Sequence, residues 1–327
     1  MTTRRMFLST VVGGLFSAPG VGGAQPAGRI ARVGYLASVP RAESGGAIQV
    51  FVAKLSEMGF IEGQNLVIEF RHGDSQVRLR AVASELIGLG VQVIHAANPY
   101  ALQAAREVTT TVPIVGYDLE SDPVAAGFAA SLARPGGNIT GVFLDQPEVS
   151  GKLLQFLTEM VPGLSRVAVL WDAPLASAQL KALEDAASRL RLMILPIVWH
   201  GPGELLRPLP ISVKEGARGL VVLSSPRIHD RYLPFVADAA LKHRLPSISL
   251  SSAFVRNGGL IAYGPVGTDM RRAAAALVVK ILGGARPADL PIERPARFEL
   301  AINPKIARAL GLTIPQSLLL RADQVIE

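Results

Sequence analysis

Short apolar runs alternate along the chain with segments whose apolar residues recur every three or four positions. The first pattern predicts buried parallel strands, and the second predicts amphipathic helices. Residues 30–36 form a nearly continuous apolar run, whereas residues 47–58 place Ile48, Phe51 and Leu55 on one helical face. Strand and helix alternate in this way through both halves, which predicts an α/β fold with doubly wound parallel sheets.

The predicted elements form two series of similar composition. In the first series the strands are residues 30–36, 66–70, 91–96, 112–117 and 139–143, and the helices are residues 47–58, 79–87, 100–108 and 124–132. In the second series the strands are residues 166–171, 193–198, 219–223, 247–250, 260–263 and 298–302, and the helices are residues 152–160, 179–190, 268–282 and 304–310.

Strand ends of the first half recur in the same order in the second half. Residues 32–40 (RVGYLASVP) are echoed by residues 166–174 (RVAVLWDAP), and residues 111–117 (TVPIVGY) by residues 244–250 (RLPSISL). Any α/β chain repeats strand then loop, but the shared order and spacing favour two Rossmann-like lobes that face each other. A cleft between two lobes is a common place for a small ligand.

The chain is expected to cross between these lobes three times, and glycine and proline are frequent at the expected crossings. The crossings are placed at residues 136–143, 257–265 and 283–295. One lobe then comprises residues 30–140 and 264–292, and the other comprises residues 141–263 and 293–327. Adjacent crossings form a hinge, and closure about a hinge traps a ligand.

The N-terminus has the pattern of an export signal. Arg4 and Arg5 precede a short apolar stretch, residues 6–16, and small residues follow as far as Ala24. The paired arginines resemble a twin-arginine signal, although an ordinary secretory route remains open. The stretch is short for a hydrocarbon layer of about 30 Å, which disfavours a permanent anchor. We therefore expect residues 1–24 to be a signal peptide that is cleaved near Ala24, and the mature protein to lie in the periplasm.

Composition narrows the possible chemistry. The 327 residues are 49% hydrophobic and 18% charged, which is typical of well-packed globular proteins. The formal net charge is +7, but the basic residues are scattered among acidic ones, so nucleic-acid binding is not expected. The chain has no cysteine, and its five histidines lack metal-ligand spacing. We expect neither a metal nor another cofactor.

Sequence signatures of catalysis are also missing. The chain contains no Gly-x-Ser-x-Gly elbow and no Walker loop, and no Gly-x-Gly-x-x-Gly follows its first strand. We therefore expect a protein that is not an enzyme. A hydrolase that uses Asp118 or Asp122 in the cleft remains a less favoured alternative, because such an enzyme would need an activated nucleophile or a metal.

Polar and aromatic side chains gather at the carboxyl ends of the predicted strands, where open α/β sheets bind ligands. The acids could receive an ammonium group, the helix N-termini attract a carboxylate, and the aromatic residues could hold an apolar group. This combination suits an amino acid or a similar small carboxylate. The same serines and aspartates are also ordinary helix N-caps, so a purely structural role stays open. The candidates are Ser38, Asn98, Tyr100, Tyr117, Asp118, Ser121, Asp122, Trp171, Asp172, Ser224, Ser225, Ser251 and Tyr263.

Three separated motifs resemble the ABC transporter substrate-binding protein family that includes the tryptophan- and tyrosine-type solute-binding proteins. The resemblance covers nearly the whole chain after the leader. The motifs are residues 133–141 (ARPGGNITG), residues 151–154 (GKLL) with 161–170 (VPGLSRVAVL), and the tail at 298–303 (FELAIN), 309–315 (ALGLTIP) and 317–323 (SLLLRAD).

The resemblance implies a class I periplasmic-binding-protein fold, with two lobes, three crossings and a ligand in the cleft. It also implies an ABC permease in the membrane and a cytoplasmic ATPase as partners, and we expect the receptor itself to be a monomer. A sensory module that serves a membrane receptor is an alternative that the sequence does not separate from transport.

The chain departs from the family pattern at the expected ligand site. Ser121 replaces a glycine in the segment Gly-Asp-Pro-Val, and Asp172 replaces the asparagine that usually follows the first strand of the second lobe. Asn98 and Tyr100 depart from a small-Thr-Pro-Ala segment. Because these departures lie at the expected ligand site, the resemblance does not fix tryptophan or tyrosine as the ligand.

Overall fold

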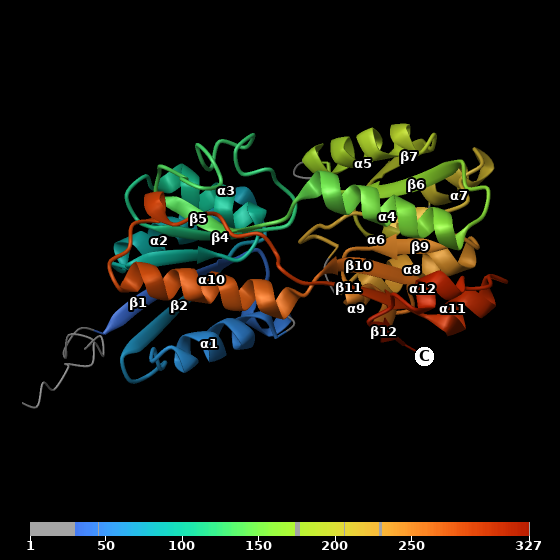
Figure 1. Cartoon of the computed structure of the whole chain (residues 1–327). Coiled ribbons are helices and arrows are strands. Elements are labelled where there is room, and N and C mark those ends of the chain that lie inside the picture. Colours follow the sequence, from blue (N-terminus) through green and yellow to red (C-terminus); the bar gives the residue numbers. More distant parts are fainter. Residues whose placement is uncertain (1–29, 45, 174–176, 206, 229–230, 327) are drawn as a thin grey trace, which may run out of the picture.

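The structure is a computed structural model that describes residues 30–326, apart from residues 45, 174–176, 206 and 229–230. The expected signal peptide, residues 1–24, lies outside the described residues. Two α/β lobes stand side by side, each built on its own sheet (Figure 1). The predicted α/β fold with parallel sheets in both lobes is therefore confirmed.

The first lobe is built on a sheet of five parallel strands in the order β2-β1-β3-β4-β5. Helices α1 and α10 cover one face and bury Phe51 and Leu277, and helices α2 and α3 cover the other face and bury Leu86 and Leu102. The elements of this lobe are β1 (Ala31–Ala37), η1 (Arg41–Glu43), α1 (Ala47–Glu57), β2 (Leu66–His72), α2 (Gln76–Gly88), β3 (Val93–Ala96), α3 (Pro99–Val108), β4 (Ile114–Asp118), β5 (Ile139–Phe143), α10 (Gly267–Leu282) and η2 (Pro287–Asp289).

The second lobe is built on a sheet of seven strands in the order β12-β11-β10-β9-β8-β6-β7. All neighbouring strands are parallel except β10 and β11. Its elements are α4 (Gln146–Met160), β6 (Arg166–Trp171), α5 (Ser177–Arg189), β7 (Met193–Val198), α6 (Pro202–Leu205), α7 (Pro208–Lys214), β8 (Leu220–Val222), α8 (Leu233–Lys242), β9 (Ser247–Ser249), α9 (Ser252–Arg256), β10 (Ile261–Pro265), β11 (Phe298–Ile302), α11 (Pro304–Ala309), α12 (Gln316–Leu319) and β12 (Gln324–Val325).

The chain passes between the two sheets at three places. It leaves the first sheet after β5, and the next helix, α4, packs in the core of the second lobe. It returns after β10, and α10 then lies beside α1 (Figure 1). It leaves again after Glu293, which still bridges to Val142 of β5, and enters β11. Each lobe is therefore assembled from segments that are distant in the sequence.

A close contact between two glycines fixes the last strand of the first sheet. A Cβ atom on Gly141 would lie 2.2 Å from the carbonyl oxygen of Gly116 on the neighbouring strand β4. Any larger residue at position 141 would force the two strands apart. The glycine that ends the motif at residues 133–141 is thus required by backbone packing.

The helix predicted at residues 124–132 is wrong, because this segment forms a series of turns. The Asp122 side chain accepts hydrogen bonds from the backbone amides of Val124 and Ala125, each at 2.8 Å. Gly127 then adopts the left-handed conformation, with φ of 70°, which interrupts a right-handed helix. The apolar residues that suggested a helix, such as Phe128, are buried under the first sheet instead.

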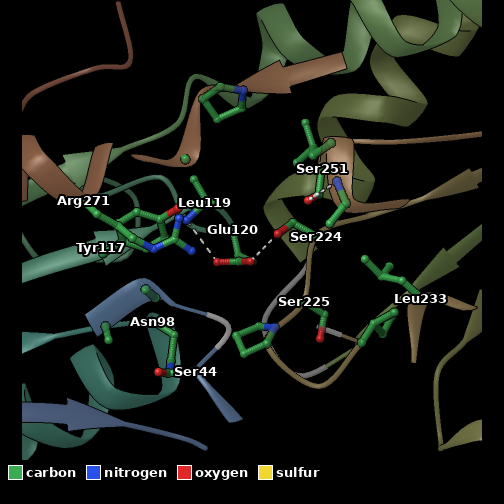
Figure 2. Close-up of a pocket in the computed structure, with 18 of the residues that line it drawn as sticks. Ser44, Asn98, Tyr117, Leu119, Glu120, Ser224, Ser225, Leu233, Ser251 and Arg271 are labelled. Carbon is green, nitrogen blue, oxygen red and sulfur yellow. Dashed lines mark hydrogen bonds between the residues drawn. The ribbon is translucent and has the colours of Figure 1, made fainter. Parts of the chain in front are cut away.

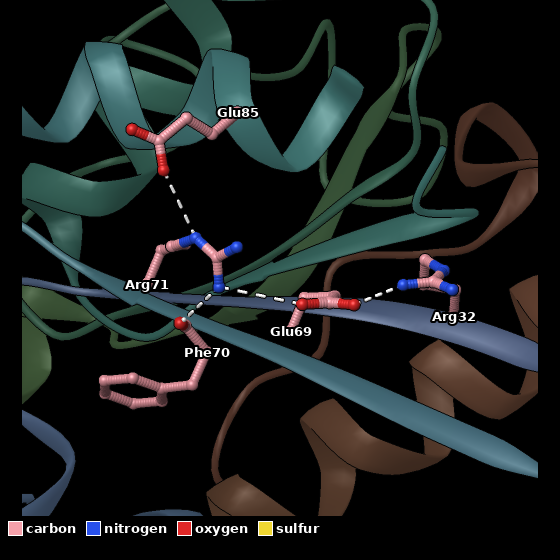
Figure 3. Close-up of polar contacts among 5 residues, drawn as sticks. All are labelled: Arg32, Glu69, Phe70, Arg71 and Glu85. Carbon is pink, nitrogen blue, oxygen red and sulfur yellow. Dashed lines mark hydrogen bonds and ion pairs between the residues drawn. The ribbon is translucent and has the colours of Figure 1, made fainter. Parts of the chain in front are cut away.

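Charged side chains line the outer strand of the first sheet (Figure 3). Glu69 on β2 pairs with Arg32 on β1 and lies 3.6 Å from Arg71, whose guanidinium also contacts Glu85 on α2 at 3.3 Å. Unpaired edges of sheets can recruit other chains, and charges on the edge discourage this. The network therefore ties the edge strand to its neighbours and protects it.

Candidate ligand-binding site

A cavity of about 550 Å³ lies between the two lobes and is lined by both of them. The first lobe contributes the loops after β1, β3 and β4 together with the start of α10, and the second lobe contributes the loops after β8 and β9. Cavities of roughly 300–1,000 Å³ are typical of small-molecule sites. Figure 2 shows the arrangement, with Tyr117 and Arg271 on one side and Ser224 and Ser251 on the other.

Glu120 lies in the middle of this cavity, on the loop that follows β4 (Figure 2). Its side chain is only 3% exposed, although it belongs to the wall. One carboxylate oxygen accepts a hydrogen bond from the Ser224 hydroxyl of the other lobe at 2.6 Å, and the second accepts from the Leu119 amide at 3.0 Å. Glu120 thus joins the two lobes at the centre of the site.

A second buried acid, Asp118 at the end of β4, shapes the loop that carries Glu120. One of its oxygens accepts hydrogen bonds from the backbone amides of Glu120 and Ser121, at 2.8 and 2.9 Å. Its other oxygen is buried without a hydrogen-bond partner. Burial raises the pKa of Asp118, and burial together with the nearby Asp118 raises the pKa of Glu120 to about 8. Both carboxyl groups therefore keep their protons to higher pH than exposed acids do.

Arg271 brings a positive charge to the same cavity from α10. Its guanidinium carbon lies 5.3 Å from the centre of the Tyr117 ring, in a cation–π contact. No ion pair or hydrogen bond between this guanidinium and another described residue is present. The cavity therefore contains an acid and a base that do not neutralise each other.

The first lobe contributes several aromatic side chains to the cavity wall. His95 is buried, stacks on Phe51 with 4.4 Å between ring centres, and contacts Tyr35 edge-on at 5.0 Å. Its Nδ1 atom lies 3.1 Å from the carbonyl oxygen of Val115. Burial lowers the pKa of His95 to about 4, so the ring is neutral at physiological pH. Tyr35, His95 and Tyr117 all line the cavity.

A second contact between the lobes lies beside the cavity and is centred on Asp172, which follows β6. One Asp172 oxygen accepts hydrogen bonds from Ser225 at 2.7 Å and from the Tyr100 hydroxyl of the other lobe at 2.9 Å. The other oxygen pairs with Arg227 at 3.0 Å. Asp172 is 1% exposed, so protein groups rather than solvent satisfy its charge.

A sequence model of the family described as ABC transporter substrate binding protein matches residues 45–326. The chain belongs to this family. The predicted family is therefore confirmed, and it is a family of proteins that bind a substrate rather than convert it.

One curated protein and several solved structures are similar to this chain over most of its length. A tyrosine-binding protein of Clostridioides difficile (strain R20291) is 23% identical over 265 residues, which is 80% of this chain and 75% of that one. The ABC domain from Streptococcus pneumonia, solved in complex with L-Trp, has a TM-score of 0.81 at 23% identity and covers 90% of this chain and 99% of its own. A conserved domain protein from Vibrio cholerae has a TM-score of 0.84 at 22% identity, covering 91% and 100%.

These neighbours also define the fold type. A putative repressor of the LACI family from Corynebacterium glutamicum has a TM-score of 0.56 at 17% identity and covers 82% of this chain and 96% of its own. The two-lobe architecture is that of the class I periplasmic binding proteins, as predicted. Within the described residues, no helix is long and apolar enough to cross a membrane, and no group of side chains is suited to a metal ion.

The structure brings six of the predicted site residues to the cavity wall: Ser38, Asn98, Tyr117, Ser224, Ser225 and Ser251. Some of these polar groups are occupied locally. Asn98 caps α3 by accepting from the Ala101 amide and donates to the Ser38 hydroxyl at 2.9 Å. Ser251 caps α9. Helix capping and a place on the cavity wall thus occur in the same residues.

The other predicted residues lie behind the wall or away from it. Asp118 and Asp172 are not part of the wall but accept hydrogen bonds from the wall residues Glu120 and Ser225. Ser121 and Tyr100 in turn donate hydrogen bonds to Asp118 and Asp172. Asp122 is exposed and caps a turn. Trp171 packs against the core of the second lobe, and Tyr263 stacks on Phe298 with 5.6 Å between ring centres.

Sequence reasoning missed both central charges. Glu120 stands three residues beyond the end of the strand predicted at residues 112–117, in a loop whose geometry the sequence does not predict. Arg271 lies next to Arg272 in the predicted helix, and the sequence does not show which of the two side chains faces a cavity. The available signal was positional, because Glu120 lies between the candidates Asp118 and Ser121.

Proposed function

We propose that this chain is the extracytoplasmic receptor of an ABC importer, that it binds an amino acid between its lobes, and that it delivers this ligand to a membrane permease driven by an ATPase. Membership of the substrate-binding family supports this proposal. The relatives named for tyrosine binding and solved with L-Trp indicate amino acids as the ligand class. The export signal expected at residues 1–24 fits a monomeric periplasmic receptor.

The observation that carries the proposal is the position of Glu120. It is a nearly buried carboxylate in a cavity shared by two lobes, and it accepts hydrogen bonds without pairing with a basic residue. A buried acid without a cation is costly, and an ammonium group would offset that cost. An α-ammonium group placed against Glu120 would also strengthen the attraction between the lobes.

Closure is the proposed mechanism, and it involves no bond chemistry. The two lobes, one built on the sheet of β1 to β5 and the other on the sheet of β6 to β12, would open about the three crossings to admit the ligand. Ligand contacts to both lobes then favour the closed arrangement, because the ligand binds that arrangement better. Glu120 to Ser224 and Tyr100 to Asp172 are contacts that closure would make.

The test is a calorimetric and thermal-shift screen of the chain without its leader against the twenty amino acids and a set of small carboxylates. An amino acid present at 100 times its Kd should stabilise the protein by about 2.7 kcal/mol. Glu120→Gln should weaken binding at least about tenfold, whereas Asp185→Asn, on the exposed surface of α5, should leave binding unchanged. Silence across all twenty amino acids, or chemical conversion of the bound one, would refute the proposal.

A further inference from the structure

We propose that Arg271 holds the carboxylate of the ligand, in a seat formed by Tyr117 and the first turn of α10. This assignment rests on the proposed function, since it names the partner of one charged end of an amino acid. It adds a binding residue that no sequence motif marks. Three observations on α10 support it.

First, Arg271 differs from the charges that surround it on the same helix. Asp269 pairs with Arg297 at 2.5 Å, and Arg272 makes two hydrogen bonds to Glu57 on α1, at 2.8 and 2.6 Å. Both pairs lie on the outer surface of the lobe. Arg271 alone among these turns towards the cavity, where no carboxylate of a described residue pairs with it. The other charged side chains of α10 all have a partner of opposite charge, so Arg271 is the one on this helix that is open to an anionic ligand.

Second, the residues around the Arg271 guanidinium leave room for it in the cavity. The side chain folds back over the Tyr117 ring towards the start of its own helix. A Cβ atom on Gly267 would lie only 2.7 Å from Nη1 of Arg271 and 4.0 Å from the Tyr117 hydroxyl. Glycine at this position therefore makes room for the guanidinium. Stacking on a ring fixes the plane of a guanidinium but leaves its in-plane N–H donors free.

Third, the start of α10 adds donors of the same sign. Val266, Gly267 and Thr268 line the cavity, and no side chain caps this end of the sixteen-residue helix. The N-terminus of a helix carries a partial positive charge, which repels a guanidinium and attracts an anion. Asp269, the acid of this first turn, is paired with Arg297. An anion bound beside Arg271 would therefore be attracted by the helix end and by the guanidinium.

The position of Glu120 completes the argument about ligand class. Arg271 and Glu120 share the cavity, but no ion pair joins them (Figure 2). A ligand that carries only an ammonium group would leave the arginine unmatched, and one that carries only a carboxylate would leave the acid unmatched. A free amino acid has both groups on one carbon and can meet both.

The test compares ligands that differ only at the carboxylate. The amino acid that stabilises the protein most in the screen is compared with its own carboxamide and with its decarboxylated amine, by calorimetry at pH 7. Charge-assisted bidentate hydrogen bonds correspond to a change of about 10- to 100-fold in affinity. The wild-type protein should therefore prefer the acid over the amide by about that factor.

Three variants and one control test whether this preference comes from Arg271 and its surroundings. Arg271→Gln should reduce the ratio of acid to amide affinity to within about threefold, and Arg271→Lys should restore part of it. Gly267→Ala keeps the arginine but displaces its guanidinium, so it should weaken binding of the acid more than that of the amide. Arg272→Gln, which removes an adjacent charge that points outwards, should preserve the wild-type ratio.

The outcomes separate the two proposals. If no amino acid binds, the proposed function and this assignment fail together. If an amino acid binds and Arg271→Gln still prefers the acid as strongly as the wild type does, only the assignment of Arg271 is overturned. Circular dichroism of each variant identifies loss of fold, and Gly267→Ala provides a second variant if Arg271→Gln does not fold.

Discussion

Glu120 should make ligand binding depend on pH. Burial and Asp118 raise the pKa of Glu120 to about 8, so much of this group carries a proton at neutral pH in the ligand-free protein. Tyr117, Ser224 and Arg271 face the same space. His95 is neutral throughout because its pKa is lowered to about 4. Glu120, coupled to the buried Asp118, is therefore a group of the cavity wall that titrates near neutrality.

The sign of the effect follows from the raised pKa. Neutral Glu120 stabilises the ligand-free fold fully at pH values below its ordinary range, and this contribution is lost as the pH rises through about 8. A bound ammonium favours the carboxylate instead, so binding should release a proton. We expect affinity to rise between pH 6 and pH 8 by up to about tenfold per pH unit. Calorimetry in buffers of different ionisation enthalpy measures both effects.

Glu120→Gln is the matched variant for this prediction. It keeps the shape of the side chain and removes its titration, so the slope of affinity against pH should flatten and the released proton should disappear. An unchanged slope in this variant would assign the titration to another group.

The same residues show what a sequence can reveal about a site. The candidates at strand ends, such as Ser38, Asn98 and Ser224, do reach the cavity, because strand polarity places them there. Glu120 and Arg271 were missed for a physical reason. Whether a charged side chain faces solvent or a cavity depends on the opposite lobe, and no local pattern records that lobe.

At the scale of elements, the charge network on β2 should contribute to stability. Glu69 is 18% exposed and serves both Arg32 and Arg71. Networks of partly buried charges contribute more than single surface pairs, which are worth about 0–1 kcal/mol. We expect Glu69→Gln to lower the free energy of unfolding by about 1 kcal/mol, and the loss should shrink in 1 M salt.

A control for this prediction exists on α5. Lys181 and Asp185 form an isolated pair whose side chains are 76% and 56% exposed. Asp185→Asn should leave urea denaturation unchanged within error. If both variants behave alike, the network at the sheet edge has no special role in stability.

Elements were predictable where a local pattern and the packing agree. The spacing of apolar residues that predicted α1 and α10 indicates a helix with one buried face. In the structure each helix buries such a face against the first sheet. The failure at residues 124–132 shows the converse. There the apolar residues are buried, but Asp122 and Gly127 fix turns that a hydrophobic pattern does not encode.

At the scale of the whole molecule, Tyr100 should control how long the lobes stay closed. Its hydroxyl donates a hydrogen bond to Asp172 across the cleft. Asp172 would retain its contacts with Ser225 and Arg227 when the lobes separate, because all three residues belong to the second lobe. Tyr100→Phe removes only the contact between lobes. A hydrogen bond to a charged group corresponds to roughly tenfold in a rate, so ligand dissociation should accelerate by about 3- to 10-fold.

Stopped-flow fluorescence provides the measurement, with association expected to change little. Arg231→Gln is the control, because Arg231 and Glu43 also connect the lobes, but at 3.6 Å and with side chains 63% and 43% exposed. An equal acceleration in both variants would show that the buried position of Asp172 confers no advantage.

The return of α10 to the first lobe has a consequence for biosynthesis. All five strands of the first sheet have emerged by Phe143, yet the helix that covers Phe51 and Leu55 emerges more than a hundred residues later. Until then α1 alone covers this face of the nascent sheet, and the apolar surface left exposed beside it invites aggregation. The first lobe is therefore incomplete until α10 has emerged. A chain that stalls before Gly267 would need a chaperone, and no single cut can yield two independent lobes.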